Sequence, residues 1–225
     1  MEKRRKLIIV GCGETASIAY EFFSIDSRYE PICFAIDNSY INSNFMYGLP
    51  VESIDNLINK YSPSEHDVFV AISSKQLNYP RALMCLRIKQ IGYKLATFIS
   101  SEASVWRNVE IGENCLVLPQ TILQPFSIIK NNVFMWVRCN IGHRSVIEDN
   151  NFLATADVAG FSKVKNNCFL GVHSIIGDEV EVSENNFIGM GCCISRNTKP
   201  NSMYVGNPAK KQPITSFQYL GISNR

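Results

Sequence analysis

Residues 111–198 repeat an aliphatic side chain at every sixth position. An α-helix would need apolar steps of three and four residues, and a half-buried strand would alternate with a period of two. A six-residue period is typical of a parallel β-helix, in which three hexapeptides make one turn and the aliphatic residues stack inside. The aliphatic residues are Ile111, Val117, Leu123, Ile129, Met135, Ile141, Ile147, Leu153, Val164, Leu170, Ile176, Val182, Ile188 and Ile194. The pattern therefore predicts a three-sided column of coils.

A second pattern accompanies the first, because the fifth position of most hexapeptides holds a small residue. We expect these side chains to fit tight inward corners of the column. They are Cys115, Thr121, Ser127, Cys139, Ser145, Cys168, Ser174 and Cys192. One unit, AGFSK, has only five residues, so we expect the register to lose a residue just after Val158.

The front of the chain has a different pattern, in which short apolar strands alternate with helical segments. A strand is predicted at residues 6–10, a helix at 16–23 and a second strand at 31–36, which ends in Asp37. Gly11 and Gly13 lie between the first strand and the helix. They permit a tight turn and bring the N–H groups of the helix start close to a phosphate. This order predicts the first half of a Rossmann-like unit.

The remaining elements before the coils are few. We predict a loop and helix over residues 49–59, a strand over 67–72, a helix over 81–92 and a strand over 94–99. The fold class is therefore a small α/β Rossmann-like domain, residues 1–100, followed by a parallel β-helix domain, residues 101–225. The aperiodic tail, residues 211–225, is predicted to cap the open strand edge of the column.

Composition narrows the classes of partner and compartment. The net charge of +2 gives no indication of nucleic-acid binding, and no apolar run approaches the ~18 residues of a membrane span. Residues 7–10 form too short an apolar run for a signal peptide, so we expect a cytoplasmic protein. The 8 cysteines contain no CxxC pair, and we interpret them as reduced thiols with no metal site.

His143 is the candidate for acid–base chemistry. As the third residue of IGHRSV it points away from the interior, between Pro125 one turn earlier and Gly160 one turn later. Imidazole titrates near neutral pH, so His143 can serve as a general base. An idle surface histidine remains the alternative. The N–H of Gly160 could donate to a thioester carbonyl, or the glycine could be a simple turn adjustment.

The other polar candidates are less specific. Asp149 and Asp157 are the aspartates that could orient His143, and the sequence does not choose between them. His66 lies in a polar segment, SPSEHD, and is expected at the surface. His173 falls on another edge of the column and is expected at the surface or at a subunit contact.

The hexapeptides, His143 and the exit segment VGNPAK at residues 205–210 resemble bacterial hexapeptide acyltransferases. With the small α/β domain, the chain resembles the sugar acetyltransferases that include bacillosamine-type and perosamine N-acetyltransferases and sialic acid O-acetyltransferases. The resemblance implies a left-handed β-helix and a homotrimer with active sites between subunits.

The resemblance also implies roles for particular residues. Gly11, Gly13, Asp37 and Ser73 would bind a nucleotide-sugar, not NAD, and His143 would be the catalytic base. Acetyl-CoA would be the co-substrate and would lie past Gly160, Val172 and Met190. The implied activity is N-acetylation of a nucleotide-linked amino-deoxysugar by direct transfer. Sugar O-acetylation is the alternative reaction, and a non-catalytic trimeric β-helix that binds a nucleotide-sugar is the alternative of another class.

Three positions depart from the family pattern. The segment Glu14–Thr15–Ala16 stands where the family commonly has glycine, histidine and a small residue. Arg144 follows the candidate base, where many members have an acid. Phe152 stands where a second histidine is common.

Overall fold

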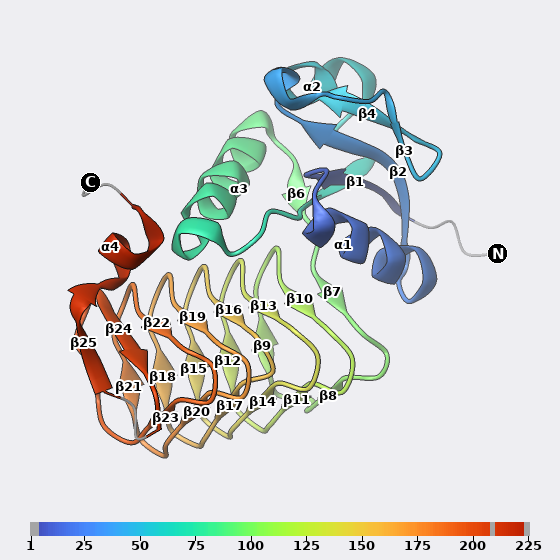
Figure 1. Cartoon of the computed structure of the whole chain (residues 1–225). Coiled ribbons are helices and arrows are strands. Elements are labelled where there is room, and N and C mark those ends of the chain that lie inside the picture. Colours follow the sequence, from blue (N-terminus) through green and yellow to red (C-terminus); the bar gives the residue numbers. More distant parts are fainter. Residues whose placement is uncertain (1–4, 208–209, 223–225) are drawn as a thin grey trace. The chain divides into compact units, whose positions relative to one another are not determined.

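The computed structural model describes residues 5–207 and 210–222 of the chain. The start of the basic leader, residues 1–4, and Pro208 and Ala209 of the exit segment lie outside the described residues. The chain divides into two compact units. The α/β unit is Met1–Ser73 with Arg81–Phe98, and the β-helix unit is Ser74–Pro80 with Ile99–Arg225. Figure 1 shows the elements of each.

The α/β unit is built on one sheet with the strand order β3-β4-β2-β1-β5-β6. Strand β1 pairs in parallel with both β2 and β5, and β3 adds an antiparallel edge to β4. The strands are β1 Arg5–Val10, β2 Tyr29–Ile36, β3 Phe45–Met46, β4 Leu49–Ser53, β5 His66–Val70 and β6 Lys94–Leu95. The helices are α1 Glu14–Ile25, α2 Leu57–Lys60 and α3 Tyr79–Ile91, with 3₁₀ turns η1 Asn38–Tyr40, η2 Ile54–Asn56 and η3 Lys75–Asn78.

The central strand explains why this sheet forms. Residues Leu7, Ile8, Ile9 and Val10 are all buried to within 1% exposure. A strand with parallel neighbours on both sides and helices over both faces has no solvent side, so it is apolar throughout rather than alternating. The predicted Rossmann-like order of strand, glycine turn, helix and strand is confirmed in β1, α1 and β2.

Two predicted elements of the α/β region are wrong in detail. The segment predicted as a loop and helix over residues 49–59 begins with strand β4, because Val51 pairs with Phe34 of β2. The strand predicted over residues 94–99 is divided between two sheets. Its first part, β6, pairs with β5, whereas its end becomes β7, Phe98–Ile99, the first strand of a β-helix face.

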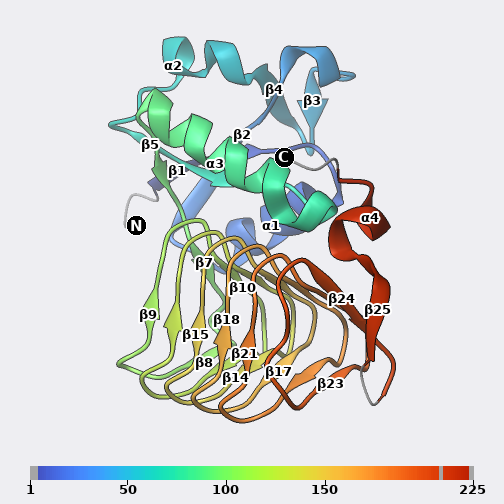
Figure 2. The same cartoon turned by 90° about the vertical axis from the view of Figure 1, so that its left-hand side faces the viewer.

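The β-helix unit is a left-handed parallel β-helix with three faces, and Figure 2 shows its coils following one another in register. The first face contains β7, β10 Leu116–Val117, β13 Phe134–Met135, β16 Phe152–Leu153, β19 Phe169–Leu170 and β22 Phe187–Ile188. The second contains β8 Ser104–Val105, β11 Ile122–Leu123, β14 Asn140–Ile141, β17 Asp157–Val158, β20 Ile175–Ile176 and β23 Cys193–Ile194. The third contains β9 Glu110–Ile111, β12 Ile128–Ile129, β15 Val146–Ile147, β18 Lys163–Val164 and β21 Glu181–Val182.

The predicted interior of this column is confirmed. The aliphatic residues of the six-residue pattern belong to one core cluster. All of them are buried except Ile111, the first, which is partly buried. The small fifth-position residues are all buried, from Cys115 to Cys192. The coils also start earlier than predicted, since Ile99 and Val105 already belong to β7 and β8.

The short coil lies on the other side of Val158 from the predicted place. Val158 occupies the inward position of β17 at 0% exposure. Phe134 pairs with Phe152, but Asn140 pairs with Asp157, so the missing residue falls between Phe152 and Asp157. The bulkier Val158 fills the interior better than Ala159, which would have had to point inward in the predicted register.

Two further segments complete the β-helix unit. Strand β24, Ser202–Val205, extends the first face, and β25, Lys210–Thr215, pairs antiparallel with it before helix α4, Ser216–Leu220. The tail thus covers the strand edge of the first face through β25, and capping of the whole column by the tail stays a prediction. The segment Ser74–Pro80 joins the same unit: Asn78 Nδ2 donates to the carbonyl of Cys168 at 3.1 Å, and Tyr79 Oη donates to Asn185 Oδ1 at 2.9 Å.

Within residues 5–207 and 210–222, no helix is both long enough and apolar enough to cross a bilayer. The same residues contain no cluster of three or more histidine, cysteine, aspartate or glutamate side chains arranged to hold a metal ion.

Candidate active site

His143 lies on the edge of the column where the chain passes from β14 to β15, and its side chain is exposed. Gly160 lies beneath the ring. A Cβ atom placed on Gly160 would stand 2.6 Å from Cε1 of His143, closer than any side chain could approach. Phe161 meets the imidazole edge-on, with ring centroids 5.0 Å apart. Because residue 160 has no side chain, the imidazole of His143 can pack directly against its backbone.

The backbone around His143 is fixed by the preceding coil. The N–H of His143 donates to Gln124 Oε1 at 3.1 Å, and Gln124 Nε2 donates to Asn140 Oδ1 at 3.3 Å. One coil on, the N–H of Phe161 donates to the carbonyl of His143 at 2.9 Å. Gln124 was not singled out from the sequence, because its position one coil earlier matters only once the coils are stacked.

The ring nitrogens of His143 have no hydrogen-bond partner within the described part of the chain. Asp149 cannot be such a partner in this structure. It lies on the next edge, where Oδ1 accepts from the N–H and Nδ2 of Asn131 at 2.8 and 3.1 Å. Asp157 is exposed on β17, and no described hydrogen bond joins it to His143. Both ring nitrogens are thus open to a ligand, and the candidate orienting acids stay unassigned.

Gly160 combines burial with an open donor. The residue is buried, its carbonyl accepts from the N–H of Glu179 at 3.0 Å, and no hydrogen bond in the described residues uses its own N–H. Gly160 N also lies at a close contact between coils, since a Cβ atom on Gly142 would come within 2.5 Å of it. A role for this N–H as a donor to the substrate stays a prediction.

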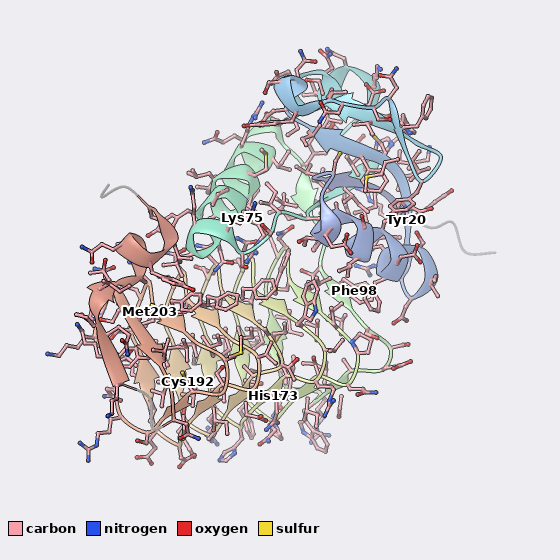
Figure 3. All side chains as sticks on the ribbon, viewed as in Figure 1. Tyr20, Lys75, Phe98, His173, Cys192 and Met203 are labelled. Carbon is pink, nitrogen blue, oxygen red and sulfur yellow. The ribbon has the colours of Figure 1, made fainter. Side chains whose placement is uncertain are left out.

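Val172 and Met190 lie on a different edge of the column, between the first and second faces. They stand one coil apart, since the N–H of Gly191 donates to the carbonyl of Val172 at 2.8 Å. Their side chains are 45% and 79% exposed. The structure therefore pairs Gly160 with His143 and Val172 with Met190, on two separate edges of one chain. Figure 3 shows His173 beside this second edge, with its side chain exposed as predicted.

In the α/β unit, the glycine turn has the geometry that the sequence predicts. Gly11 has φ +124°, and a Cβ atom there would lie 2.8 Å from the carbonyl oxygen of Ala71. Gly13 is the N-cap residue of α1 and has open space around its Cα. The first N–H groups of α1 have no intrahelical acceptors and form an anion-attracting end. Glu14 lies in this first turn and is exposed.

Asp37 follows β2, as predicted, but it is not a free acceptor. Arg87 of α3 bridges Asp37 Oδ1 at 2.5 Å and Asp55 Oδ1 at 2.6 Å. These two carboxylates raise the pKa of the Arg87 guanidinium, chiefly because the guanidinium donates a hydrogen bond to Asp37. Ser73 is half-buried just after β5, at the same carboxyl edge of the sheet. Sequence reasoning missed Arg87 because only the fold brings α3 to the end of β2.

The remaining departures have structural roles. Arg144 lies over the ring of Phe126, with 4.5 Å from Cζ to the ring centroid, so it packs against the preceding coil. Phe152 stacks on Phe169 at 5.6 Å, and Phe169 stacks on Phe187 at 5.0 Å, in a ladder outside the first face.

His66 and six of the eight cysteines are buried, whereas Cys12 and Cys193 are partly exposed. The prediction of a surface His66 is wrong, because it begins β5 at 5% exposure and its Nδ1 lies 2.9 Å from the carbonyl of Ser62. All cysteines are free thiols. Burial raises the pKa of Cys139 and of Cys168 to about 12, so neither supplies a thiolate near neutral pH.

Comparison with known proteins shows the fold. No family model and no curated protein matches the chain. Among solved structures, the acetyltransferase domain of PglB from Neisseria gonorrhoeae FA1090 has a TM-score of 0.84 at 23% identity, covering 93% of this chain and 100% of that chain. PerB from Caulobacter crescentus, in complex with CoA and GDP-perosamine, has a TM-score of 0.81 at 21% identity, covering 92% and 97%. WeeI from Acinetobacter baumannii AYE has a TM-score of 0.71 at 20% identity, covering 92% and 99%. The chain thus shares their two-part architecture of an α/β region and a left-handed β-helix.

Proposed function

We propose that this protein is an acetyl-CoA-dependent N-acetyltransferase that acts on the amino group of a nucleotide-linked amino-deoxysugar. The observation that carries the proposal is His143, an exposed imidazole seated on Gly160 with both ring nitrogens open to a ligand. Two proteins of the same fold support the substrate class. The PglB domain has a structure in complex with acetyl coenzyme A, and PerB has one with CoA and GDP-perosamine.

The reaction needs one base and one carbonyl-polarising donor. His143 takes a proton from the sugar amine while the nitrogen lone pair attacks the thioester carbonyl. The N–H of Gly160 donates to the carbonyl oxygen as negative charge develops there. The new C–N bond forms, the C–S bond breaks, and the departing thiolate takes the proton from His143. The acetyl group passes directly to the amine, with no covalent enzyme intermediate.

The other predicted residues bind the two substrates. Gly11, Gly13 and the start of α1 hold the diphosphate of the nucleotide-sugar, and Ser73 lies at the neighbouring strand end. Asp37 contributes through its pair with Arg87, whose remaining N–H groups face the ligand as donors. The exposed side chains of Val172 and Met190 provide an apolar edge for the pantetheine arm of acetyl-CoA.

A homotrimer brings the two edges of the column together. The His143 edge of one subunit meets the Val172 and Met190 edge of the next, and a head-to-tail contact of this kind closes into a ring. The second face supports this arrangement, because Trp106, Ile122 and Ile175 project from it at 54%, 45% and 47% exposure. Sedimentation velocity tests it: a monomeric mass at working concentration would remove the trimer and the shared site together.

Replacement of His143 tests the catalytic assignment. We expect His143→Ala to lower kcat by about 100-fold or more, with acetyl-CoA and nucleotide-linked amino sugars as substrates and thiol release as the readout. Lys130→Ala is the control, because it removes an exposed side chain after β12, on the edge of the column that carries neither His143 nor Val172 and Met190. Gly160→Ala should also lower kcat, since the added methyl displaces the imidazole. Full turnover in His143→Ala would show that His143 is not the catalytic base.

The choice of acceptors separates the alternatives. A panel of 3-amino and 4-amino nucleotide-sugars and their hydroxyl counterparts reports whether nitrogen or oxygen is acetylated. Transfer only to hydroxyl acceptors would replace N-acetylation with O-acetylation. Nucleotide-sugar binding without thiol release from any acceptor would leave a non-catalytic binding protein.

A further inference from the structure

The amino-terminal edge of the sheet contains a cavity of about 420 Å³ that the proposed acetyl transfer does not use. Its lining residues stand at or next to the starts of β1, β2, β5 and β6. The glycine turn lies at the opposite end of β1, about 17 Å away at the rise of an extended strand. All the lining residues belong to the α/β unit. They are Arg5, Arg28, Tyr29, Ser64, Asp67 and Lys94.

Arg5 is the fixed wall of this cavity. One of its terminal nitrogens donates to Asp67 Oδ1 at 2.8 Å and the other donates to the carbonyl of Ser64 at 2.9 Å. Asp67 therefore neutralises Arg5 and holds it in place. Glu65 is a neighbouring carboxylate that acts on Arg5 electrostatically, but it does not line the cavity.

Arg28 and Lys94 leave the cavity with uncompensated positive charge. Arg28 lies over the ring of Tyr29, with 5.5 Å from Cζ to the centroid, so its guanidinium has a preferred position. Within the described part of the chain, neither Arg28 nor Lys94 forms an ion pair. Among the lining residues Asp67 is the one acid, and it is already paired with Arg5, so Arg28 and Lys94 line the cavity without a counter-ion in it. A concave surface with one sign of charge concentrates ligands of the other sign.

We propose that this cavity is a binding site for a small phosphorylated anion, separate from the nucleotide site at the glycine turn. Arg28 supplies a planar fork that fits two phosphate oxygens, and Lys94 supplies a point charge for a second phosphoryl group. The volume accommodates a diphosphate ester, since ligand pockets range upward from about 300 Å³. Tyr29 is only 6% exposed, so no open aromatic face is present for a base, and recognition rests on the phosphates.

Titration calorimetry of the full chain at low salt, with pyrophosphate as the probe, tests this site. We expect saturable binding that the double variant Arg28→Gln/Lys94→Gln weakens by about 100-fold, or tenfold for each charged contact. The control Lys60→Gln/Lys89→Gln removes the same charge from α2 and α3 outside the cavity and should change the affinity by less than about threefold. Circular dichroism checks that both variants are folded.

Three results would overturn the proposal. These are no binding to the unaltered chain, equal binding to the unaltered chain and the double variant, or citrate binding as tightly as pyrophosphate. Equal binding would place the probe elsewhere, and tight citrate binding would remove the preference for phosphate. The nucleotide-sugar KM should stay unchanged in the double variant, so this test and the His143 test fail independently.

Discussion

The two units of this protein use backbone strain in opposite ways. In the β-helix, the corners of the coils repeatedly place residues other than glycine in the left-handed region. Examples are Gln120 at φ 60°, Phe126 at 65°, Arg138 at 62°, Arg144 at 57° and Phe161 at 53°. In the α/β unit, the tight turn after β1 is made by Gly11 at φ +124°, against the carbonyl of Ala71. The β-helix distributes a small cost over many corners, whereas the turn after β1 combines a positive φ with a close backbone contact at Gly11, where a side chain would not fit.

The hydrophobic cores of the two units also differ, because one is built by repetition and the other from elements that occur once. Each coil of the β-helix stacks its inward residue on those of the coils before and after it, so neighbouring coils share a core that grows by repetition. The α/β core is assembled from elements that occur once, such as Ile8 of β1, Leu57 of α2 and Ile88 of α3. Repetition lets a local pattern specify the structure, while the α/β core requires distant segments to meet.

The largest expected effect compares the two sides of one coil. Ile129→Ala should destabilise the β-helix by about 2–5 kcal/mol, because it opens a cavity in the filled column. Ile128 is adjacent in β12, half-buried on the third face and outside the second face proposed for the trimer, so Ile128→Ala should cost about 1 kcal/mol. Urea denaturation followed by circular dichroism measures both, and similar losses would contradict the inward and outward assignment.

The second largest effect is expected from a substitution in the glycine turn after β1. Gly11→Ala should destabilise the α/β unit by about 2–4 kcal/mol, since the methyl meets the carbonyl of Ala71 and φ is positive. Gly92→Ala has a positive φ near that of Gly11, +107°, and its new methyl would meet only Pro63 Cγ at 4.0 Å, so it isolates the conformational cost. We expect about 1 kcal/mol for that control. An equal loss in both variants would show that the contact with Ala71 is unimportant.

Alkaline pH tests the interior of the column. Burial raises the pKa of Cys139 and Cys168 to about 12, above the ordinary thiol value of 9.0. The unfolded chain then releases these protons first, so stability is fully present below pH 9 and falls as pH rises toward 12. The slope is about 1.4 kcal/mol per pH unit for each thiol. The double variant Cys139→Ala/Cys168→Ala should show a shallower fall in denaturation midpoint above pH 9, and an identical fall would exclude the thiols as its cause.

The smallest expected effect is a gain. Arg138 is exposed and has φ 62°, so Arg138→Gly should relieve left-handed strain and stabilise the β-helix by about 0.5–1 kcal/mol. The flexibility of glycine in the unfolded chain offsets part of this gain. Asn132→Gly, at φ 58°, is the matched comparison. Asparagine tolerates this region well, and this asparagine donates to Asn150 Oδ1 at 2.9 Å, so that change should be destabilising.

The sequence was sufficient for the parts of the molecule governed by local rules. The inward column and the outward direction of His143 followed from a six-residue count. The count could not decide whether Val158 or Ala159 points inward, because either fits between Leu153 and Val164, and packing volume decided it. The segment 74–80 could not be placed either, since its contacts with Cys168 and Asn185 are long-range.

The candidate site shows the same division. Gly11, Gly13, His143 and Gly160 could be proposed from the sequence because each occupies a recognisable position in a local motif. Arg87 and Gln124 were missed because their partners, Asp37 and His143, are distant in sequence. Burial of His66 was missed because SPSEHD reads as polar, whereas the segment leads directly into a central parallel strand.

Strand β25 reverses direction on β24 and ends the first face with Lys210, Lys211 and Pro213. A proline lacks the N–H that another strand would need, and lysines disfavour an approaching edge. The column consequently ends where the chain reverses at β25, and no residue pattern inside a coil limits how many coils precede that point. Duplication of one whole coil before β24 would therefore lengthen the column and leave both of its ends unchanged. Related proteins could differ in column length by this route.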